Sequence, residues 1–438
     1  MNIKDKVPDG WEVFSFGNKE LVNIIDGDRG KNYPKEKDFF DEGYCLFLNT
    51  KNVTNRGFNF NTNKYITKEK DNSLRSGKLN RYDIVMTTRG TIGNCGFYDD
   101  FVKYDNIRIN SGMVIFRVIS DKIFQKYLYM FLTSNIMREQ ILSCTTGTAQ
   151  PQLPIWTINK LYFFLPPLSE QKRIASILSS LDDKIELNNK TNKILEEMAQ
   201  TIFKEWFINF NFPNEDGKPY KKSGGEMIDS ELGKIPKGWK VDIISNFFNV
   251  TIGKTPPRKE IECFSKNCKD TKWVSISDMG NSGLFIVDTS EYLTSEAIKK
   301  YNVNIVPQNT VILSFKLTIG RVSITSEDMT TNEAIAHFNS YNNFINEYLY
   351  FYLKNFNYRV LGNTSSIAEA INSKIIKSIK IIIPKENTLN KFHNAVFDMF
   401  NLIKNNQIEN EKLSNIRDSL LPKLMTPKGR RADGEIRV

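Results

Sequence analysis

The sequence predicts a mixed α/β protein in which two globular domains, built from one repeated module, are joined by two long coiled-coil helices. Three observations predict this: motifs that recur in the same order, short apolar runs between turn residues, and two long stretches with helical apolar spacing. The recurring motifs are residues 7–13 and 235–241, 91–93 and 318–320, 127–129 and 348–350, and Leu195 and Leu413. A duplicated module makes the chain pseudo-two-fold, which suits a two-part target.

Length and composition indicate a folded, soluble protein. The chain has 438 residues, of which 40% are hydrophobic and 25% charged, and this length favours two to three domains. No apolar run approaches the roughly 20 residues needed to cross a bilayer, and the first residues lack the apolar core of a signal peptide. We therefore expect a cytoplasmic protein with no membrane partner, in which five scattered cysteines stay reduced.

The charge balance gives a mild indication of the partner. Sixty Lys and Arg against 50 Asp and Glu give a net charge of +10. Such a charge favours a polyanion such as nucleic acid, although a generally Lys-rich composition is an equal alternative.

Each module consists of short predicted strands and an aromatic helix. Turn residues separate the strand-like runs, and the runs are 44–48, 83–87, 112–118 and 161–165 in the first module and 311–315, 334–338 and 379–383 in the second. Residues 122–134 and 346–355 have the spacing of amphipathic helices. The globular domains are predicted to span residues 1–167 and 234–384.

Two long helices follow the two modules. Pro166 and Pro167 end the preceding strand, Ser169 is a suitable N-cap, and the charge of Glu170 suits a helix N-terminus. The first helix is predicted over 168–210, with an apolar stripe of Ile174, Leu178, Leu181, Ile185, Leu195, Met198 and Ile202. The second is predicted over 385–425, with a stripe of Phe392, Val396, Phe400, Ile403, Leu413, Ile416 and Leu420. Their matched length predicts an intramolecular coiled-coil pair, the alternative being that each packs on its own globule.

Two segments lie outside the modules and helices. Residues 211–233 are rich in Asn, Asp, Gly, Lys and Pro and are predicted to be a connector. Residues 426–438 form a basic tail.

The residues that catalysis or metal binding would need are missing. His337 and His393 lie in apolar patterns, which favours structural roles, and Cys263 and Cys268 have no second pair nearby to complete a zinc site. Gly253-Lys254-Thr255 resembles the end of a phosphate-binding loop, but Phe248 stands where that loop needs glycine. The chain also lacks an Asn-Pro-Pro-aromatic motif of DNA amino-methyltransferases. We expect no enzyme activity, metal or cofactor in this chain.

One group of motifs is similar to a known family. The stretch Leu165-Pro166-Pro167-Leu168-Ser169-Glu170-Gln171-Lys172-Arg173-Ile174 resembles the start of the central helix in specificity subunits of type I restriction–modification enzymes. Further similar segments are 203–207, 224–227, 232–239, 420–425 and 434–438. The resemblance covers essentially the whole chain, including the duplication.

The resemblance implies a fold and a set of partners. It implies two target-recognition domains, each binding one half of a bipartite double-stranded DNA site, and two antiparallel helices that set the spacer and dock adenine-N6 methyltransferase subunits. Two methyltransferase (modification) subunits would carry S-adenosylmethionine, and two restriction subunits would use ATP and Mg for translocation and cleavage. The second helix starts Pro384-Lys385-Glu386-Asn387 without the Pro-Pro-Leu-x-Glu-Gln motif, so the two helical repeats are unequal, and whether both methyltransferases bind equally is an open question.

Loop residues with suitable donors and acceptors are the candidates for DNA contact, because Arg and Lys recognise guanine and Asn and Gln recognise adenine. In the first domain they are Lys31, Asn32, Lys51, Asn52, Arg56, Arg89, Gln150 and Gln152. In the second they are Lys254, Thr255, Arg258, Ser277, Asp278, Lys316, Arg321, Ser365 and Ser366. The alternative for each is an ordinary surface residue or a phosphate contact. Arg89-Gly90 differs from Lys316-Leu317, so the two half-sites should differ in sequence.

Three other functions stay open at this point. One is a complete methyltransferase fused to its own recognition module, which a bound S-adenosylmethionine would reveal. Another is a paired-globule scaffold or RNA-binding protein, which would not prefer a double-stranded DNA site. The third is an orphan specificity subunit that never assembles with partners.

Overall fold

The computed structural model describes residues 10–55, 57–144, 152–340, 343–361 and 371–425. The chain forms two compact units, one made of Met1–Asp182 and Asn415–Val438 and the other of Asp183–Ser414. Each unit is discontinuous in sequence, because each long helix begins in one unit and ends in the other. The two units share the long helices, and the six-part division from the sequence stays a prediction.

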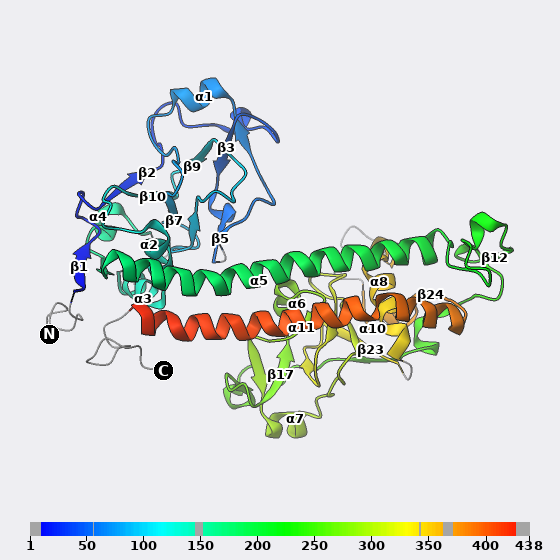
Figure 1. Cartoon of the computed structure of the whole chain (residues 1–438). Helices are drawn as coiled ribbons and strands as arrows, with labels where there is room; N and C mark the ends of the chain where they lie inside the picture. Colours follow the sequence, from blue (N-terminus) through cyan, green and yellow to red (C-terminus); the bar gives the residue numbers. More distant parts are fainter. Residues whose placement is uncertain (1–9, 56, 145–151, 341–342, 362–370, 426–438) are drawn as a thin grey trace. The chain divides into compact units, whose positions relative to one another are not determined.

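The first unit is built on a four-stranded sheet (Figure 1). Its order is β2 (Val22–Asp26), β10 (Met113–Val118), β7 (Ile84–Thr87) and β8 (Cys95–Phe97), all antiparallel. The smaller sheets are β6 (Tyr65–Ile66), β3 (Cys45–Leu48) and β9 (Ile107–Ile109), with β3 parallel to β9, then β1 (Glu12–Ser15) with β11 (Tyr162–Leu165), and β4 (Val53–Thr54) with β5 (Gly57–Phe58). The helices are α1 (Lys68–Ser73), α2 (Gln125–Leu132), α3 (Asn135–Cys144) and α4 (Ile155–Ile158). The four predicted strands of this module and its predicted helix are confirmed.

The second unit repeats this plan with one extra strand in the main sheet and one in the smaller sheet. Its main sheet has the order β15 (Asn249–Ile252), β23 (Ile335–Asn339), β20 (Val311–Ser314), β21 (Val322–Thr325) and β18 (Phe285–Ile286). The other sheets are β16 (Phe264–Ser265), β19 (Glu291–Leu293), β17 (Thr271–Val274) and β22 (Thr330–Thr331), then β14 (Lys240–Ile243) with β24 (Lys380–Ile383), and β12 (Met227–Ser230) with β13 (Gly233–Pro236). The helices are α6 (Ile276–Asn281), α7 (Ser295–Tyr301), α8 (Asn346–Asn355) and α10 (Ser373–Lys377). The three predicted strands and the helix over 346–355 are confirmed, and the predicted connector contains β12, the first strand of a hairpin with β13.

The internal repeat is visible in the topology of the two units. In each, the module's first strand pairs antiparallel with its last, as β1 with β11 and β14 with β24. In each, the smaller sheet contains one parallel pair, β3 with β9 and β17 with β22. Equivalent tryptophans, Trp11 and Trp239, are buried in the cores of their units. The predicted pseudo-two-fold repeat is confirmed.

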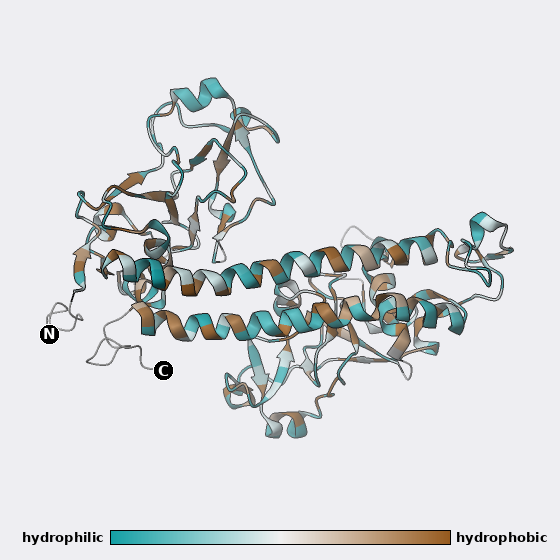
Figure 2. Ribbon diagram, in the orientation of Figure 1, coloured by the Kyte–Doolittle hydropathy of each residue, from teal (hydrophilic) through white to brown (hydrophobic). Residues whose placement is uncertain are grey.

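The two long helices pair antiparallel through polar side chains. They are α5 (Leu168–Phe203), which continues as a π-helix over Lys204–Ile208, and α11 (Glu386–Met425). In the second unit, Asn188 Nδ2 donates to Glu409 Oε2 (2.7 Å) and Asn410 Oδ1 (2.9 Å). Asn406 Nδ2 donates to Asn192 Oδ1 (2.8 Å). Residue numbers fall along α11 as they rise along α5, so the pair is antiparallel, and Figure 2 shows hydrophilic residues recurring along both helices.

The apolar residues of the helices are divided between the two cores. Ile174, Leu178 and the end of α11 at Leu424 belong to the core of the first unit. Phe392, Val396, Phe400 and Ile403 belong to the core of the second, as does the far end of α5 at Phe203. Both packing arrangements considered from the sequence are therefore present, because the ends of each helix lie on globules while its middle pairs with the other helix.

Two residues of the predicted stripes are exposed, which corrects the prediction. Met198 and Ile416 are 48% and 47% exposed. The buried line instead runs through Ala199 and Phe203 of α5, one position further on, and continues to Phe207 in the π-helix. At 3.6 residues per turn that shift moves Met198 off the packed face. Ile416 is the equivalent of Met198 in the repeat that aligns Leu195 with Leu413, so the exposed apolar residue is at the same place in both helices.

None of the helices in the described ranges is both long and apolar enough to span a membrane.

Candidate nucleic-acid interface

In the first unit the loop candidates gather at one edge of the sheets. The strands β2 and β7 both run antiparallel to β10, so their C-terminal ends lie beside the start of β10. The parallel pair β3 and β9 also ends together. The loops that leave this edge carry Lys31, Lys51 and Arg89, which are all exposed.

Hydrogen bonds between the loops hold this edge together. The backbone N–H of Thr88 donates to Gly112 (2.8 Å), and the N–H of Leu153 donates to Thr88 (3.0 Å). Arg89 and Gln152 face each other across an isolated β-bridge. A Cβ atom on Gly112 would lie 3.1 Å from Thr50 Cγ2 and 3.8 Å from Arg89 Cβ. Residues from four separate segments, those of Thr50, Thr88–Arg89, Gly112 and Gln152–Leu153, are therefore neighbours.

The second unit forms the same edge from equivalent strands. The N–H of Gly253 donates to Ile335 (3.0 Å), and that of Lys254 to Thr331 (2.9 Å). The N–H of Asn332 donates to Val274 (3.0 Å), and that of Phe315 to Ala334 (2.9 Å). These bonds join the loops after β15, β17, β20 and β22, so Lys254, Ser277 and Lys316 lie along one edge.

A pair of close backbone approaches confirms that the two edges correspond. A Cβ atom on Gly27 would lie 2.1 Å from the carbonyl oxygen of Asn110, and one on Gly253 would lie 2.1 Å from that of Asn332. Only glycine fits between such neighbouring chains, and it recurs at the same place in both units.

Two candidates have structural roles and are corrected. Asn52 is buried, and its Nδ2 donates to Asn59 (2.9 Å) and Thr62 (3.0 Å) while its Oδ1 accepts from Asn49 N–H. Asp278 is also buried and accepts from the N–H groups of Ser275 (2.8 Å) and Ser290 (3.1 Å). Both are the N3 residue of a capping box. Each box begins the short helix that follows an equivalent strand, β3 in the first unit and β17 in the second. Their polar atoms are used within the protein, so neither is available to read a base.

Three other candidates in the second unit have partners inside the protein. The guanidinium of Arg258 lies over the rings of Phe264 (4.2 Å) and Trp273 (4.6 Å), and its Nη1 contacts Glu291 Oε2 at 2.9 Å. Arg321 Nη1 donates to the carbonyl of Ile276, and Thr255 Oγ1 donates to Glu333. We infer that these residues shape the loops, whereas Lys254, Ser277 and Lys316 remain the better contact candidates.

Lys31 and Asn32 border a small pocket whose other lining residues are Asp28, Gly30, Ser73 and Arg75. Asn32 Nδ2 donates to the carbonyl of Ser73 (3.0 Å), so this side chain braces the loop. Burial would raise the pKa of the Asp28 carboxyl, but N–H groups of Gly30, Arg75 and Ser76 donate to it and hold its pKa below the usual value. The loop that carries Lys31 is therefore fastened by a buried carboxylate.

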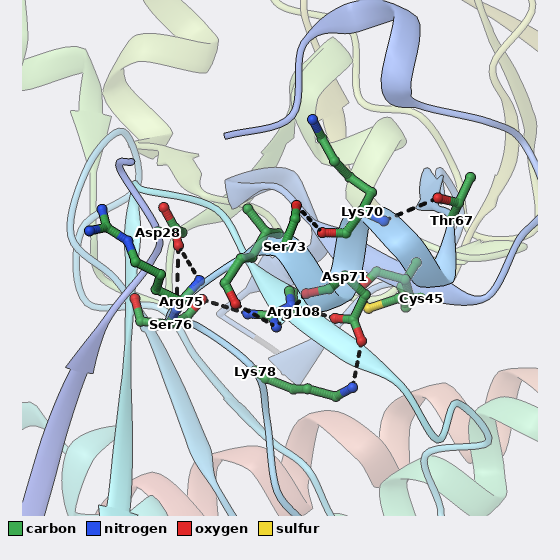
Figure 3. Close-up of polar contacts among 12 residues, drawn as sticks. Asp28, Cys45, Thr67, Lys70, Asp71, Ser73, Arg75, Ser76, Lys78 and Arg108 are labelled. Atoms are coloured by element: carbon green, nitrogen blue, oxygen red, sulfur yellow. Dashed lines mark hydrogen bonds and ion pairs between the residues drawn. The ribbon is translucent and has the colours of Figure 1, made fainter. Parts of the chain in front are cut away.

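A buried ion cluster supports the same region (Figure 3). The Asp71 carboxylate is 1% exposed and pairs with both Arg108 and Lys78. Arg108 also donates to the carbonyls of Ser76 (2.7 Å), Asp71 (2.8 Å) and Leu74 (3.3 Å), which fastens α1 to β9. Burial alone would raise the pKa of Asp71, but hydrogen bonds from Lys78 and Arg108 lower it. Sequence reasoning missed this cluster, because the positions of its charges have no regular spacing.

His337 lies beneath the edge of the second unit in a structural role, as predicted. Its Nδ1 is 2.9 Å from Thr251 Oγ1 and its Nε2 is 2.6 Å from Thr331 Oγ1. Burial lowers the pKa of His337 to about 4, so the ring is neutral at pH 7. His393 lies on α11 with its Nδ1 3.1 Å from Glu347 Oε2.

Some candidates lie outside the described residues, and one surface residue was missed. Arg56, Gln150, Ser365 and Ser366 are outside the described ranges, and their DNA contacts remain predictions. The missed residue is Leu317, at the tip of the loop after β20 and 83% exposed. The signal for it was the repeat alignment, in which Leu317 takes the place of Gly90.

Arg89→Ala is expected to weaken binding of the cognate DNA by about 1–3 kcal/mol and to relax one base position, because a bidentate Arg–guanine contact contributes about that much discrimination. The preference at each position is measured by binding to a set of single-base variants of the site. Lys51→Ala is the comparison variant: if Lys51 contacts a phosphate, the change should weaken all sequences alike, with a salt dependence flatter by about one unit of slope, and if it reads a base, one position should relax instead. An unchanged preference at every position in the Arg89 variant would exclude a base-reading role.

Within the described residues, no group of three or more His, Cys, Asp or Glu side chains is placed to hold a metal ion. The buried carboxylates described above are occupied by backbone N–H groups or by Arg and Lys.

Comparisons with known proteins agree with this description. Residues 8–197 and 236–417 each match the family model "Type I restriction modification DNA specificity domain". The type I restriction enzyme MjaIX specificity subunit of Methanocaldococcus jannaschii is 29% identical, over 99% of this chain and 95% of that protein. The HindI specificity subunit of Haemophilus influenzae is 24% identical, over 91% of this chain and 97% of that protein.

One solved structure supports the fold. The S subunit of a type I restriction–modification system from M. genitalium has a TM-score of 0.55 and 15% identity, and the match covers 95% of this chain and 96% of that one. The two family-model matches cover most of this chain, one on each module. The chain therefore belongs to the family of type I restriction–modification DNA specificity subunits, and it is a DNA-recognition subunit and not itself an enzyme.

Proposed function

We propose that each globular domain reads one half of an asymmetric bipartite double-stranded DNA site, with the paired helices as the spacer. The observation that carries this proposal is the loop edge built twice, from equivalent strands but with different side chains at its tip. Arg89 and Gly90 stand on one edge where Lys316 and Leu317 stand on the other. Because different side chains favour different bases, the two half-sites differ in sequence.

The helices also dock two adenine-N6 methyltransferase subunits. Leu187, Ile194 and Met198 are exposed on α5. Their spacing of seven and four residues places them on one helix face, the pattern of a seam that packs against a partner helix. Leu187 and Asn188 are adjacent, so this face lies about 100° around the helix from the Asn188 pairing. Met198, which is 48% exposed, acquires a role on this face.

The two docking faces differ in chemistry. The repeat that aligns Leu195 with Leu413 pairs Leu187 with Asn405, Ile194 with Lys412 and Met198 with Ile416. The face on α11 is therefore mostly polar and buries less apolar area against a partner. The methyltransferase bound at the α5 face binds more tightly, in line with the missing Pro-Pro-Leu-x-Glu-Gln motif before α11.

The cofactors belong to the other subunits of the complex. The methyltransferases hold S-adenosylmethionine, and two restriction subunits use ATP and Mg for translocation and cleavage. This chain supplies the recognition that directs both activities to one site.

The test is single-molecule sequencing of N6-methyladenine in host DNA, with the gene intact and with it deleted. A bipartite motif with two different halves that disappears on deletion supports the proposal and gives both half-sites at once. A methylation pattern that does not change on deletion would contradict it. Complementation with the intact gene is the control and should restore the motif.

A further inference from the structure

The loop after β20 carries a leucine in a backbone conformation that leucine rarely adopts. Leu317 has φ = +60°, in the left-handed region. The N–H of Thr318 donates to the carbonyl of Lys316 at 2.7 Å, and this bond across a single residue is the pattern of a γ turn centred on Leu317. A γ turn with positive φ is rare and strained for any residue with a Cβ atom.

The equivalent loop of the first module has a glycine at this position, and glycine adopts a left-handed conformation without strain. Thr91 aligns with Thr318, so Gly90 is the equivalent of Leu317, and Gly90 has φ = +71°. The base of both loops is the same: Thr87 Oγ1 donates to the carbonyl of Thr91, and Ser314 Oγ donates to that of Thr318 (2.6 Å). The N–H groups of Gly93 and Gly320 donate to Thr87 (2.9 Å) and Ser314 (3.0 Å). The backbone demands a left-handed residue in both, yet only one module uses glycine.

Packing within the chain does not account for the leucine. The side chain is 83% exposed, whereas its neighbour Phe315 is buried. The Lys316 ammonium lies 5.7 Å from the centroid of the Phe315 ring, so Lys316 can fold back along the loop. Leu317 then forms the tip of the loop edge. Backbone strain at an exposed position is typical of a residue that contacts a ligand.

We propose that Leu317 contacts the 5-methyl group of a thymine in the second half-site, in the major groove. This inference rests on the proposed function, because it needs the edge of the second domain to face DNA. Thymine is the base whose major-groove edge carries a methyl group, and apolar side chains recognise it by contact. The cationic Lys316 next to Leu317 matches the phosphates that flank such a base. Gly90 offers no side chain, so the first half-site has no equivalent contact.

The experiment uses the full-length chain assembled with its methyltransferase subunits and a duplex carrying the bipartite site. Each thymine of the second half-site is replaced in turn by deoxyuridine, which lacks the methyl group and keeps base pairing. We expect about fourfold weaker binding at one position, the effect of one methyl-sized group buried. Deoxyuridine in the first half-site is the control for effects on the duplex itself.

Two variants test the residue. Leu317→Gly should bind the thymine site about tenfold more weakly and should no longer distinguish thymine from deoxyuridine. It should also keep or raise the melting temperature, because glycine fits this turn, so lost binding is not lost folding. Leu317→Met keeps an apolar side chain and should retain the discrimination.

The outcomes separate this inference from the proposed function. If the wild-type complex binds the bipartite site but is insensitive to deoxyuridine at every position, the thymine contact is wrong and the proposed function stands. The same holds if the second half-site contains no thymine, or if Leu317→Gly loses methyltransferase subunits instead of DNA. If the wild-type complex does not prefer the bipartite site at all, both fail together.

Discussion

Lengthening both long helices by one heptad is expected to lengthen the DNA spacer and leave both half-sites unchanged. The insertions belong between Asp182 and Asp183 in α5 and between Ser414 and Asn415 in α11. These points separate contacts within the first unit from contacts within the second. The Asp182–Arg417 pair stays with the first unit, and the Lys184–Glu409 and Asn188–Asn410 contacts stay with the second. Seven residues add about 10 Å at the helical rise, or about three base pairs at 3.4 Å each.

The effect on the original site should be large, since its two halves are no longer engaged together. Specific sites typically bind 10³-fold or more tightly than non-specific DNA, so we expect a loss on the order of 10³-fold at the original spacing. The methylated motif, determined by single-molecule sequencing of a host with the doubly lengthened chain, gives the new spacer directly. If the doubly lengthened chain is active and its spacer is unchanged, the length of the helices does not set the spacer.

A single insertion is the matched control. With seven residues added to α5 alone, the Asn188–Asn410 and Asn192–Asn406 hydrogen bonds and the Asp182–Arg417 ion pair require different registers of the two helices, so one set must break. Buried asparagines fix the register of paired helices because an unpaired amide in the seam is costly. This variant should lose site-specific methylation without gaining a new motif.

Arg108→Met is expected to destabilise the first unit by about 3–5 kcal/mol. The substitution leaves the Asp71 carboxylate, 1% exposed, with Lys78 as its remaining ion-pair partner. It also removes the donor to the carbonyls of Ser76, Asp71 and Leu74. Removing one partner of a buried pair costs about this much because the other charge stays desolvated. Urea unfolding of the full chain, with hydrogen exchange of peptides from α1 and β9, measures the loss.

Arg81→Met is the control for this prediction. Arg81 likewise donates to two backbone carbonyls, Asp99 and Val102, at 2.8 Å each, and pairs with Asp105 at 3.0 Å. Asp105 is largely exposed, so water replaces the lost partner and the ion pair contributes less than about 1 kcal/mol. Equal losses in the two variants would show that burial of Asp71 does not set the cost.

The sequence predicted the elements and their repetition well because both are local or periodic features. The strands β3, β7, β10 and β20 and the helix α8 follow apolar runs between turn residues, and such runs determine local structure. The loop candidates Arg89 and Gln152 also proved to be neighbours across a β-bridge. The sequence could not show that Asn52 and Asp278 cap helices instead of contacting DNA. Both roles use the same side-chain donors and acceptors, and only burial distinguishes them.

The sequence alone therefore determined the family, the duplicated module, the two long helices and the loops that face outward. The tertiary structure decided which residues fill which role: the polar seam of Asn188 and Asn406, the displaced Met198 and Ile416, and the strained turn at Leu317. The physical reason is that apolar periodicity indicates which face of an element is buried but does not identify the residues that this face packs against. Hydrogen-bond partners and backbone strain arise between residues far apart in the chain, where no spacing rule applies.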